Sequence, residues 1–171
     1  PARRASVMSG IAPPGLEVRD SASPFPYRLT TWLLDVNVLL ALLDPTHLHH
    51  ERAHHWFAVA GQSWASCAVT QNGAMRIMSH ASYPNRVEST ALAAELVADL
   101  CSQPGHRFWA DDVSLLDAPF VLRERLSSSA QITDTWLLAL AVKRGGRLAT
   151  FDSRLVTTAV RGGDAAKFVI G

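Results

Sequence analysis

The 171 residues of this chain suffice for one domain with its own hydrophobic core, and 48% of them are hydrophobic against 18% charged. The net charge of +1 neither requires nor excludes a nucleic-acid partner, and no apolar run reaches the ~18 residues that a membrane span needs. Cys67 and Cys101 have neither a zinc-site spacing nor a disulfide framework. We therefore expect a reducing compartment, the cytoplasm, and no membrane association.

The first 30 residues differ in composition from the rest of the chain. They contain five of the nine prolines and show neither a helical nor a strand periodicity. Two arginines near the start are not followed by the apolar stretch of a signal peptide. We therefore expect residues 1–30 to form a flexible, proline-rich leader and residues 31–171 to form the folded domain.

From residue 31 onward, strand-like and helix-like segments alternate. The apolar runs predict strands over 32–36, 64–68, 107–110, 148–151 and 167–170. The helical periodicity predicts helices over 38–43, 49–59, 69–78, 88–100, 118–126 and 133–143, the first with Asn37 as its N-cap. The predicted core residues are Leu33, Leu34, Val36, Leu39, Leu137, Leu140, Leu148 and Phe151. This alternation indicates an α/β fold in which helices cover both faces of a parallel sheet of four to five strands.

Acidic residues lie at the carboxyl ends of two predicted strands, where parallel α/β sheets bind their ligands. Asp35 ends the first strand, Asp152 follows the fourth, and Asp134 opens a helix at the same edge if the connections are short and right-handed. A helix cap would explain Asp134, and a turn would explain Asp152. Asp35 is harder to explain in this way, because a carboxylate among apolar neighbours is costly unless something compensates its charge.

Together, these three carboxylates would repel one another, and their short motifs hold no obvious basic partner. A divalent cation removes that repulsion, and Mg²⁺ and Mn²⁺ prefer oxygen ligands. Such a cation activates water and stabilises charge on a phosphodiester during hydrolysis. The pattern therefore predicts a Mg²⁺ or Mn²⁺ site formed by Asp35, Asp134 and Asp152.

Three acidic motifs follow one another along the chain: LLDVNVL at 33–39, TDTWLLALA at 133–141 and TFD at 150–152. In this order, and each in its expected strand or helix, they resemble the motifs of PIN-domain ribonucleases. More narrowly, residues 31–171 resemble the VapC toxins of bacterial type II toxin–antitoxin systems. The segments 50–57 and 145–152 are also similar to mycobacterial members.

The resemblance implies a PIN-like α/β/α sandwich and a Mg²⁺- or Mn²⁺-dependent endoribonuclease that cuts structured RNA, tRNA or rRNA, and so inhibits translation. It also implies a cognate VapB-type antitoxin and a homodimer. By resemblance, Asp35, Asp134 and Asp152 are the catalytic and metal-binding acids. Asn37 matches a polar residue beside them, and Thr150 orients Asp152.

One position departs from the family pattern. Members usually supply a Glu from the helix after the second strand, and the matching residue here is Gly73; Gln71 is an amide where some relatives carry an acid. The missing charge predicts weaker binding, of one ion rather than two. It leaves open the alternative of a catalytically weak PIN domain that binds RNA or an antitoxin. Asp111 and Asp112, after the third strand, either reach the same edge or cap a turn.

Other residues allow more than one interpretation. A phosphoacceptor receiver domain also has acids at strand ends, but it needs a Lys at a strand end, and Lys143 lies within a predicted helix. The histidines between His47 and His55 form either a transition-metal site or a helix face that contacts solvent or RNA. Arg76 and Arg154 are candidate contacts to the RNA backbone, since phosphate neutralisation supplies much of the affinity for RNA.

Overall fold

The computed structural model describes residues 29–116, 118–126 and 128–171. Within these residues, five parallel strands form one sheet in the order β3-β2-β1-β4-β5. The strands are β1 (Trp32–Leu34), β2 (Trp64–Ser66), β3 (His106–Phe108), β4 (Arg147–Thr150) and β5 (Lys167–Val169). The expected leader lies outside the described residues except for its last two, so its boundary stays a prediction.

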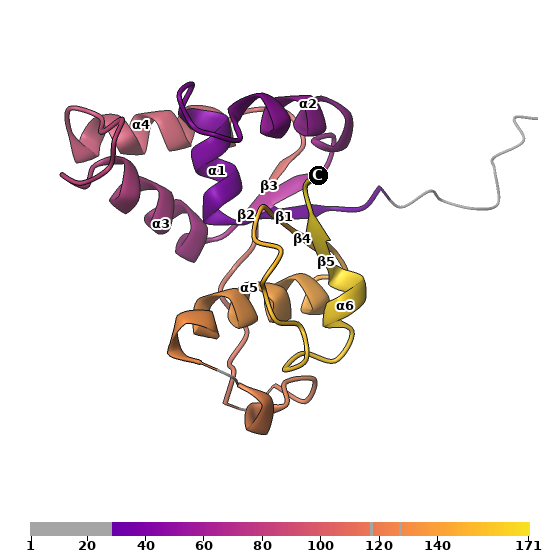
Figure 1. Ribbon diagram of the computed structural model, residues 1–171. Coiled ribbons are helices and arrows are strands. Elements are labelled where there is room, and N and C mark those ends of the chain that lie inside the picture. The colour runs from indigo at the N-terminus through magenta and orange to yellow at the C-terminus, as the bar shows by residue number, and fades with distance from the viewer. Residues whose placement is uncertain (1–28, 117, 127) are drawn as a thin grey trace, which may run out of the picture.

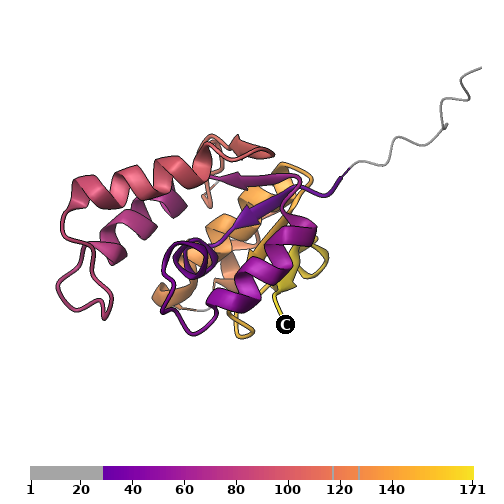
Figure 2. The same cartoon turned by 90° about the horizontal axis from the view of Figure 1, so that it is seen from above.

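Helices cover both faces of the sheet. The helices are α1 (Val36–Leu43), α2 (His50–Ala60), α3 (Ala68–Met78), α4 (Thr90–Cys101), α5 (Ile132–Lys143) and α6 (Gly163–Ala166). Figure 1 shows α1, α2 and α4 above the sheet, α3 beside it, and α5 and α6 below it. Figure 2 shows α3 and α4 side by side, away from α2. The predicted α/β/α sandwich on a parallel sheet is confirmed. None of the helices in the described ranges is long and apolar enough to cross a membrane.

The apolar runs of the central strands reflect burial on both faces. Leu33 and Leu148 pack against the layer of α5, whereas Leu34 and Ala149 pack against the layer of α1. Successive side chains of a strand point to opposite faces, so a parallel strand covered on both sides is apolar throughout. Six of the eight predicted core residues are buried, and the exceptions, Val36 and Phe151, are half-buried.

The predicted helix over 118–126 is wrong. These residues form turns, with a 3₁₀ helix only at Arg123–Arg125. Their backbone instead pairs with residues 159–161: Leu122 N donates to Ala159 O at 2.8 Å, and Phe120 O accepts from Arg161 N at 2.9 Å. Those bonds to a distant segment replace the i to i−4 bonds that a helix would need. The short helix α6 has no counterpart among the predicted elements.

The two central strands lie at the point where the strand order reverses. From β1 the chain continues to β2 and β3 on one side of the sheet, and later to β4 and β5 on the other. Such a switch point leaves a crevice outside the carboxyl ends of the strands, where ligands of open α/β sheets bind. The register pairs Leu34 with Ala149, so the next residues, Asp35 and Thr150, emerge side by side.

Candidate active site

Asp35 is held at the end of β1 by three hydrogen bonds. Its Oδ1 accepts from the Val36 backbone N–H at 2.7 Å, which makes Asp35, rather than the predicted Asn37, the N-cap of α1. Its Oδ2 accepts from Asn37 Nδ2 at 2.8 Å and from Thr150 Oγ1 at 2.6 Å. The carboxylate is only 7% exposed, so these bonds fix its orientation.

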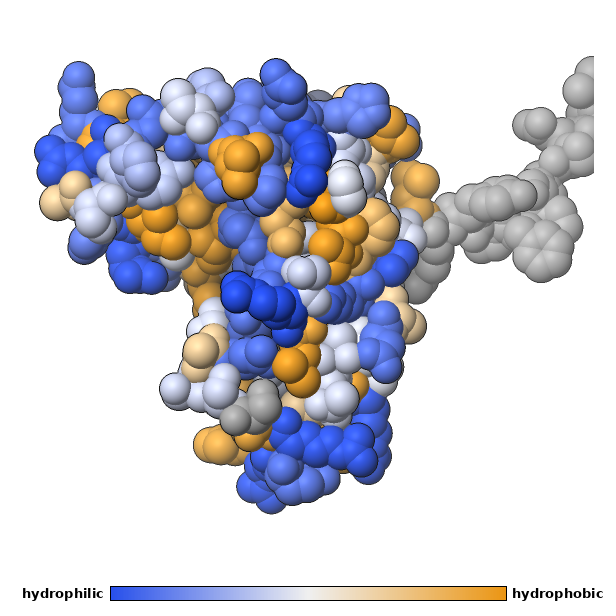
Figure 3. All heavy atoms as spheres, viewed as in Figure 1, coloured by the Kyte–Doolittle hydropathy of each residue, from blue (hydrophilic) through white to orange (hydrophobic). Residues whose placement is uncertain are grey.

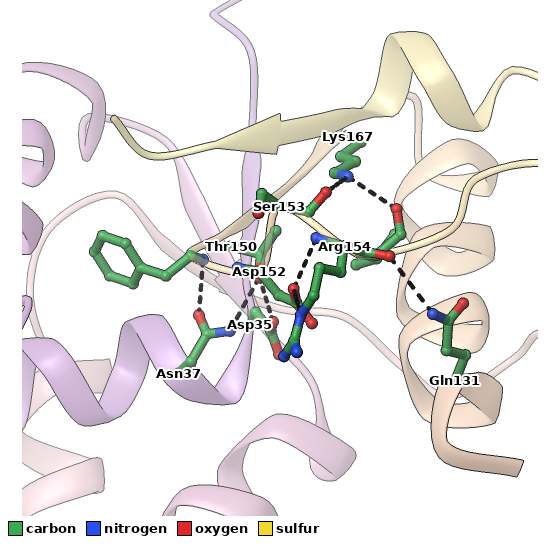
Figure 4. A network of polar contacts seen from close by, with 10 residues as sticks. Asp35, Asn37, Gln131, Thr150, Asp152, Ser153, Arg154 and Lys167 are labelled. Atoms are coloured by element: carbon green, nitrogen blue, oxygen red, sulfur yellow. Dashed lines mark hydrogen bonds and ion pairs between the residues drawn. The ribbon is translucent and has the colours of Figure 1, made fainter.

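Asn37 and Thr150 join the ends of β1 and β4 into one network (Figure 4). Asn37 Nδ2 also donates to Thr150 Oγ1 at 3.0 Å, and its Oδ1 accepts from the Phe151 backbone N–H at 3.1 Å. Thr150 Oγ1 in turn accepts from the Asp152 backbone N–H at 3.0 Å. Both residues therefore position the backbone that presents Asp152 as well as the side chain of Asp35.

The loop after β4 is held by contacts to its backbone carbonyls. Lys167 Nζ donates to the carbonyls of Ser153 and Leu155, each at 2.8 Å. Within the loop, Asp152 Oδ1 accepts from the backbone N–H of Arg154 at 2.8 Å, so the turn explanation of Asp152 holds as well. The Arg154 side chain forms an ion pair with Asp152 at 3.3 Å, and it is otherwise 89% exposed (Figure 4).

The third acid comes from the first turn of α5. Asp134 is not the cap of that helix, because α5 begins at Ile132 with Gln131 as its N-cap residue. Burial raises the pKa of Asp134, and the neighbouring Asp152 carboxylate raises it further. Burial also raises the pKa of Asp35 to about 6, against the effect of its Thr150 and Val36 hydrogen bonds and with a contribution from Asp134 and Asp152. The three predicted acids thus act on one another electrostatically.

The residues around these acids suit a hard divalent cation. Asp35 and Asp134 line one hollow of about 490 Å³, together with Asn72, Gly73 and Arg76. Asp152 lines a second hollow with Asn37. The carboxylate and amide oxygens of this set are the donors that Mg²⁺ and Mn²⁺ prefer. No three His, Cys, Asp or Glu side chains in the described part of the chain are close enough to form a metal site unaided. Water would therefore have to complete the coordination.

Gly73 lines the hollow, but its missing side chain has a structural cause. A Cβ at this position would lie 2.8 Å from Val36 Cγ2, closer than such contacts occur. Helix α3 therefore approaches the first turn of α1 at this glycine. A Glu at this position would need the Val36 side chain to move, so the expected vacancy for a fourth acid is partly filled by Val36.

The other candidate acids and amides lie elsewhere. Gln71 Nε2 donates to Ser66 Oγ at 2.9 Å, in a cluster with Cys101 rather than in the hollow of Asp35. Asp112 forms ion pairs at 3.2 Å with Lys143 and at 3.0 Å with Arg144, at the opposite end of α5 from Asp134. Neither residue supplies the missing charge, and of the two interpretations of Asp112 the structure excludes the one that places it in the site.

The histidines close the C-terminal end of α1. His50 Nδ1 lies 2.8 Å from the Ala41 carbonyl, and His54 Nε2 lies 3.0 Å from that of Leu42. A carbonyl only accepts, so both ring nitrogens donate and satisfy carbonyls of the last helical turn. The transition-metal interpretation of this cluster is not supported, since no such metal group occurs among the described residues.

Some residues of the site have no motif that marks them in the sequence. Asn72 and Thr133 line the hollow of Asp35 and Asp134, and Lys167 holds the loop that follows Asp152. Lys167 is one of two lysines among 16 basic residues, which is the one available signal. Figure 3 shows hydrophilic side chains over the middle of this face, with hydrophobic patches on either side.

Known proteins share both the sequence pattern and the fold. A sequence model of the PIN domain matches residues 32–160. The chain is 50% identical over 133 residues to Ribonuclease VapC44 of Mycobacterium tuberculosis, covering 76% of this chain and 92% of that protein. It is 41% identical over 133 residues to Ribonuclease VapC39 of the same organism, covering 77% and 96%. The crystal structure of Mycobacterium tuberculosis VapC20, titled a sarcin-ricin loop cleaving toxin, aligns with a TM-score of 0.54 at 14% identity, covering 75% of this chain and 95% of that one. This last likeness shows a shared fold.

Proposed function

The chain belongs to the PIN-domain family and, within it, to the VapC proteins, and from this premise we propose that it is the toxin of a type II toxin–antitoxin system. Its activity is divalent-metal-dependent endonucleolytic cleavage of structured RNA, tRNA or rRNA, which inhibits translation. The observation on which this proposal rests is the buried Asp35 carboxylate, oriented by Thr150 and Asn37 and facing two further acids. A protein has no structural need for such mutual repulsion, which a bound cation would relieve.

In the proposed site, Asp35, Asp134 and Asp152 would hold the ion through carboxylate oxygens, with bound water completing the contacts that the side chains do not reach. A bound Mg²⁺ or Mn²⁺ supplies charge stabilisation at the phosphate and lowers the pKa of a bound water. Thr150 and Asn37 keep Asp35 oriented through the bonds described above, so little reorganisation is needed when the substrate arrives. In the hydrolysis, a water oxygen bonds to phosphorus, the bond to one ribose oxygen breaks, and a proton reaches that leaving oxygen.

We propose that two arginines near the acids, Arg76 and Arg154, contact the phosphates of the RNA backbone. Arg76 lines the hollow of Asp35 and Asp134, and Arg154 lies beside Asp152. Both side chains are exposed, and a guanidinium contacts a phosphate through two parallel hydrogen bonds. These positions support binding of a phosphate on either side of the carboxylates.

The test is cleavage of total RNA by the antitoxin-free full chain with Mg²⁺ or Mn²⁺. We expect discrete cleavage products that EDTA and Asp35→Asn both abolish. Asp99→Asn is the matched control, because Asp99 is an exposed aspartate on α4, far along the chain from the three motifs. Cleavage that persists in Asp35→Asn would contradict the proposed site, and the absence of cleavage by the folded wild type would contradict the proposed activity.

A second candidate function follows from Gly73. The missing fourth carboxylate favours a catalytically weak PIN domain that binds RNA or an antitoxin without efficient cleavage. The two functions differ in one measurement: a binding protein shifts RNA in a gel with Mg²⁺ present and leaves its length unchanged.

We extend the proposal to partners and location by family membership. The proposed function requires a cognate VapB-type antitoxin. Members of the family are usually homodimers and act in the cytoplasm, and we propose the same for this chain. Co-purification with the antitoxin and light scattering of the purified chain test the first two. Loss of RNA cleavage on addition of the antitoxin would support neutralisation.

A further inference from the structure

A hollow of about 480 Å³ lies beside the carboxylates, and the reaction proposed above leaves most of its lining unused. Asn37 and Asp152 belong to both the hollow and the acidic network (Figure 4). The hollow is shallow and open to solvent, so it suits a flat group that lies against the surface better than a ligand enclosed on all sides. The lining that the reaction leaves unused consists of His47, Leu48, His49, Phe151 and Ser153.

An aromatic platform forms part of this lining. The rings of His49 and Phe151 are stacked, with their centroids 4.4 Å apart and their planes 23° apart. The Arg52 guanidinium lies 5.5 Å from the Phe151 centroid, and the His49 backbone N–H donates to His47 Nδ1 at 3.1 Å. Both rings of the stacked pair are half-buried. A fixed aromatic surface of this kind is what unstacked bases of single-stranded RNA bind.

The rim of the hollow suits the rest of a nucleotide. Leu48 is 89% exposed, so its side chain contributes nothing to the core and is free to cover the edge of a flat ligand. On the acidic side, the Arg154 guanidinium is exposed and forms an ion pair with the Asp152 carboxylate at 3.3 Å. An apolar side chain, an aromatic platform and a cation thus line the same hollow as the Asp152 carboxylate.

From this arrangement we infer that the hollow binds one unstacked base of the RNA, next to the phosphodiester that the carboxylates cut. His49 is the stacking surface, Leu48 covers the edge of the base, and Arg154 contacts the adjoining phosphate. The inference rests on the proposed ribonuclease function and adds to it a position at which base identity affects cleavage. Burial, with the positive charges of Arg52 and His47, lowers the pKa of His49, which suits a neutral stacking ring.

The test measures the fluorescence of a base analogue as it binds in the hollow. The probe is a short single-stranded oligoribonucleotide with a central 2-aminopurine, whose emission is quenched when it stacks. The full chain is used in an Asp35→Asn background with Mg²⁺, which prevents cleavage during the titration. We expect quenching on binding, and in His49→Ala a loss of the quench with about tenfold weaker binding, a typical value for one stacked base.

Three further variants separate stacking from structure. His49→Phe should restore the quench, because it keeps the flat ring and removes the ring nitrogens. Leu48→Ser should weaken binding without affecting the fold, since Leu48 is almost fully exposed. His55→Ala is the matched control, an exposed histidine of α2 outside the hollow, and should behave like its background.

Sequencing of RNA ends after cleavage by the chain with its native Asp35 gives the second measurement. Wild type should show a base bias at one position beside the cut, and His49→Ala should lose that bias. An unchanged quench and bias in His49→Ala would overturn the inference and leave the ribonuclease function intact. A quench lost equally in His49→Phe, or absent while wild type still cuts RNA, would also overturn it. If wild type does not cut RNA at all, the proposed function fails instead.

Discussion

Two buried aspartates stand at opposite ends of helix α1, and their surroundings have opposite effects on their charge. Asp35 precedes the helix and is 7% exposed; Asp44 ends it and is 5% exposed. Burial raises the pKa of Asp35 to about 6. Burial also acts to raise the pKa of Asp44, but hydrogen bonds from Tyr83, Thr46 and Asn85 outweigh it and hold that pKa below the usual value.

The dipole of the helix alone would have the opposite effect on the two pKa values: it would lower that of Asp35 and raise that of Asp44. Its N-terminus favours a negative charge and its C-terminus disfavours one. Asp44 nevertheless keeps its charge, because Tyr83 Oη donates to it at 2.7 Å, Asn85 Nδ2 at 2.6 Å, and Thr46 through both its backbone and its hydroxyl at 2.9 Å. Asp35 also accepts three hydrogen bonds, but burial outweighs their effect on its pKa, and two other carboxylates raise that pKa further. The hydrogen bonds of Asp44 account for its charge within the fold, whereas the environment of Asp35 supports the ion site proposed above.

The largest expected effect is on cleavage, from the same substitution made at each end of the helix. Asp35→Asn should lower the rate of RNA cleavage by about 100-fold or more, because it removes a charge that the site needs in the transition state. Asp44→Asn should leave the rate per folded molecule unchanged. Initial rates with Mn²⁺, normalised to the folded fraction, measure both. Equal losses of cleavage rate in the two variants would contradict a functional role that is specific to Asp35.

Stability should respond in the opposite order. Asp44→Asn should destabilise the fold by about 1–3 kcal/mol, because its NH₂ group replaces one carboxylate oxygen and then faces either the Tyr83 hydroxyl or the donors of Thr46 and Asn85. Asp35→Asn should be neutral or stabilising in EDTA, since it removes a repelled charge. Urea unfolding gives the free energies. Tyr83→Phe is the control and should cost about 1 kcal/mol, the value of one hydrogen bond.

The sequence predicts the environment of Asp35 better than that of Asp44, because the two depend on interactions of different sequence separation. The apolar run around Asp35 and the order of the three motifs identify the acids, because strand burial and short α/β connections are local patterns. For Asp44 the sequence indicates only the end of a helix, since its partners Tyr83 and Asn85 lie about forty residues away and their approach is set by tertiary packing.

The same limit explains the errors. The segment 118–126 contains helix-compatible residues, yet its backbone pairs with 159–161. Gly73 in the sequence indicates a missing ligand, whereas the contact with Val36 that a side chain would make is visible only once α1 and α3 are packed. Histidines at helical spacing suggest a metal, but His50 and His54 bind carbonyls of the preceding helix.

The dependence of stability on pH separates the two aspartates without a large change in structure. Asp44 has a lowered pKa when folded, so its stabilisation is present above about pH 4, the unfolded value, and is lost as the pH falls through the folded value. Asp35 has a raised pKa, so the folded state binds the proton more tightly and stability falls as the pH rises from about 4 through 6.

Comparison of each Asp→Asn variant with wild type in EDTA should therefore give two curves of opposite slope. Asp44→Asn should approach wild type below about pH 4. Asp35→Asn should become more stable relative to wild type as the pH rises from about 4 through 6, and the difference should stay constant above that range. Parallel curves would show that the two carboxylates experience similar environments after all.

The smallest expected effect comes from adding a fourth carboxylate on the Asp35 side. Gly73→Glu gains up to about 1 kcal/mol in helix propensity but brings its Cβ within 2.8 Å of Val36 Cγ2, so its net effect on stability should be under about 1 kcal/mol.

Val36→Ala with Gly73→Glu makes room for the side chain. In EDTA, the added charge should lower the stability of the double variant relative to Val36→Ala alone, because it faces Asp35 and Asp134. With Mn²⁺, the same charge should tighten binding several-fold in calorimetry, as an added carboxylate ligand. Opposite signs in these two measurements would place the introduced carboxylate among the acids and sharpen the contrast with Asp44. A stability loss with unchanged Mn²⁺ affinity would show that the side chain points away from the ion, and the fourth ligand would then be sought at Asn72, which lines the same hollow.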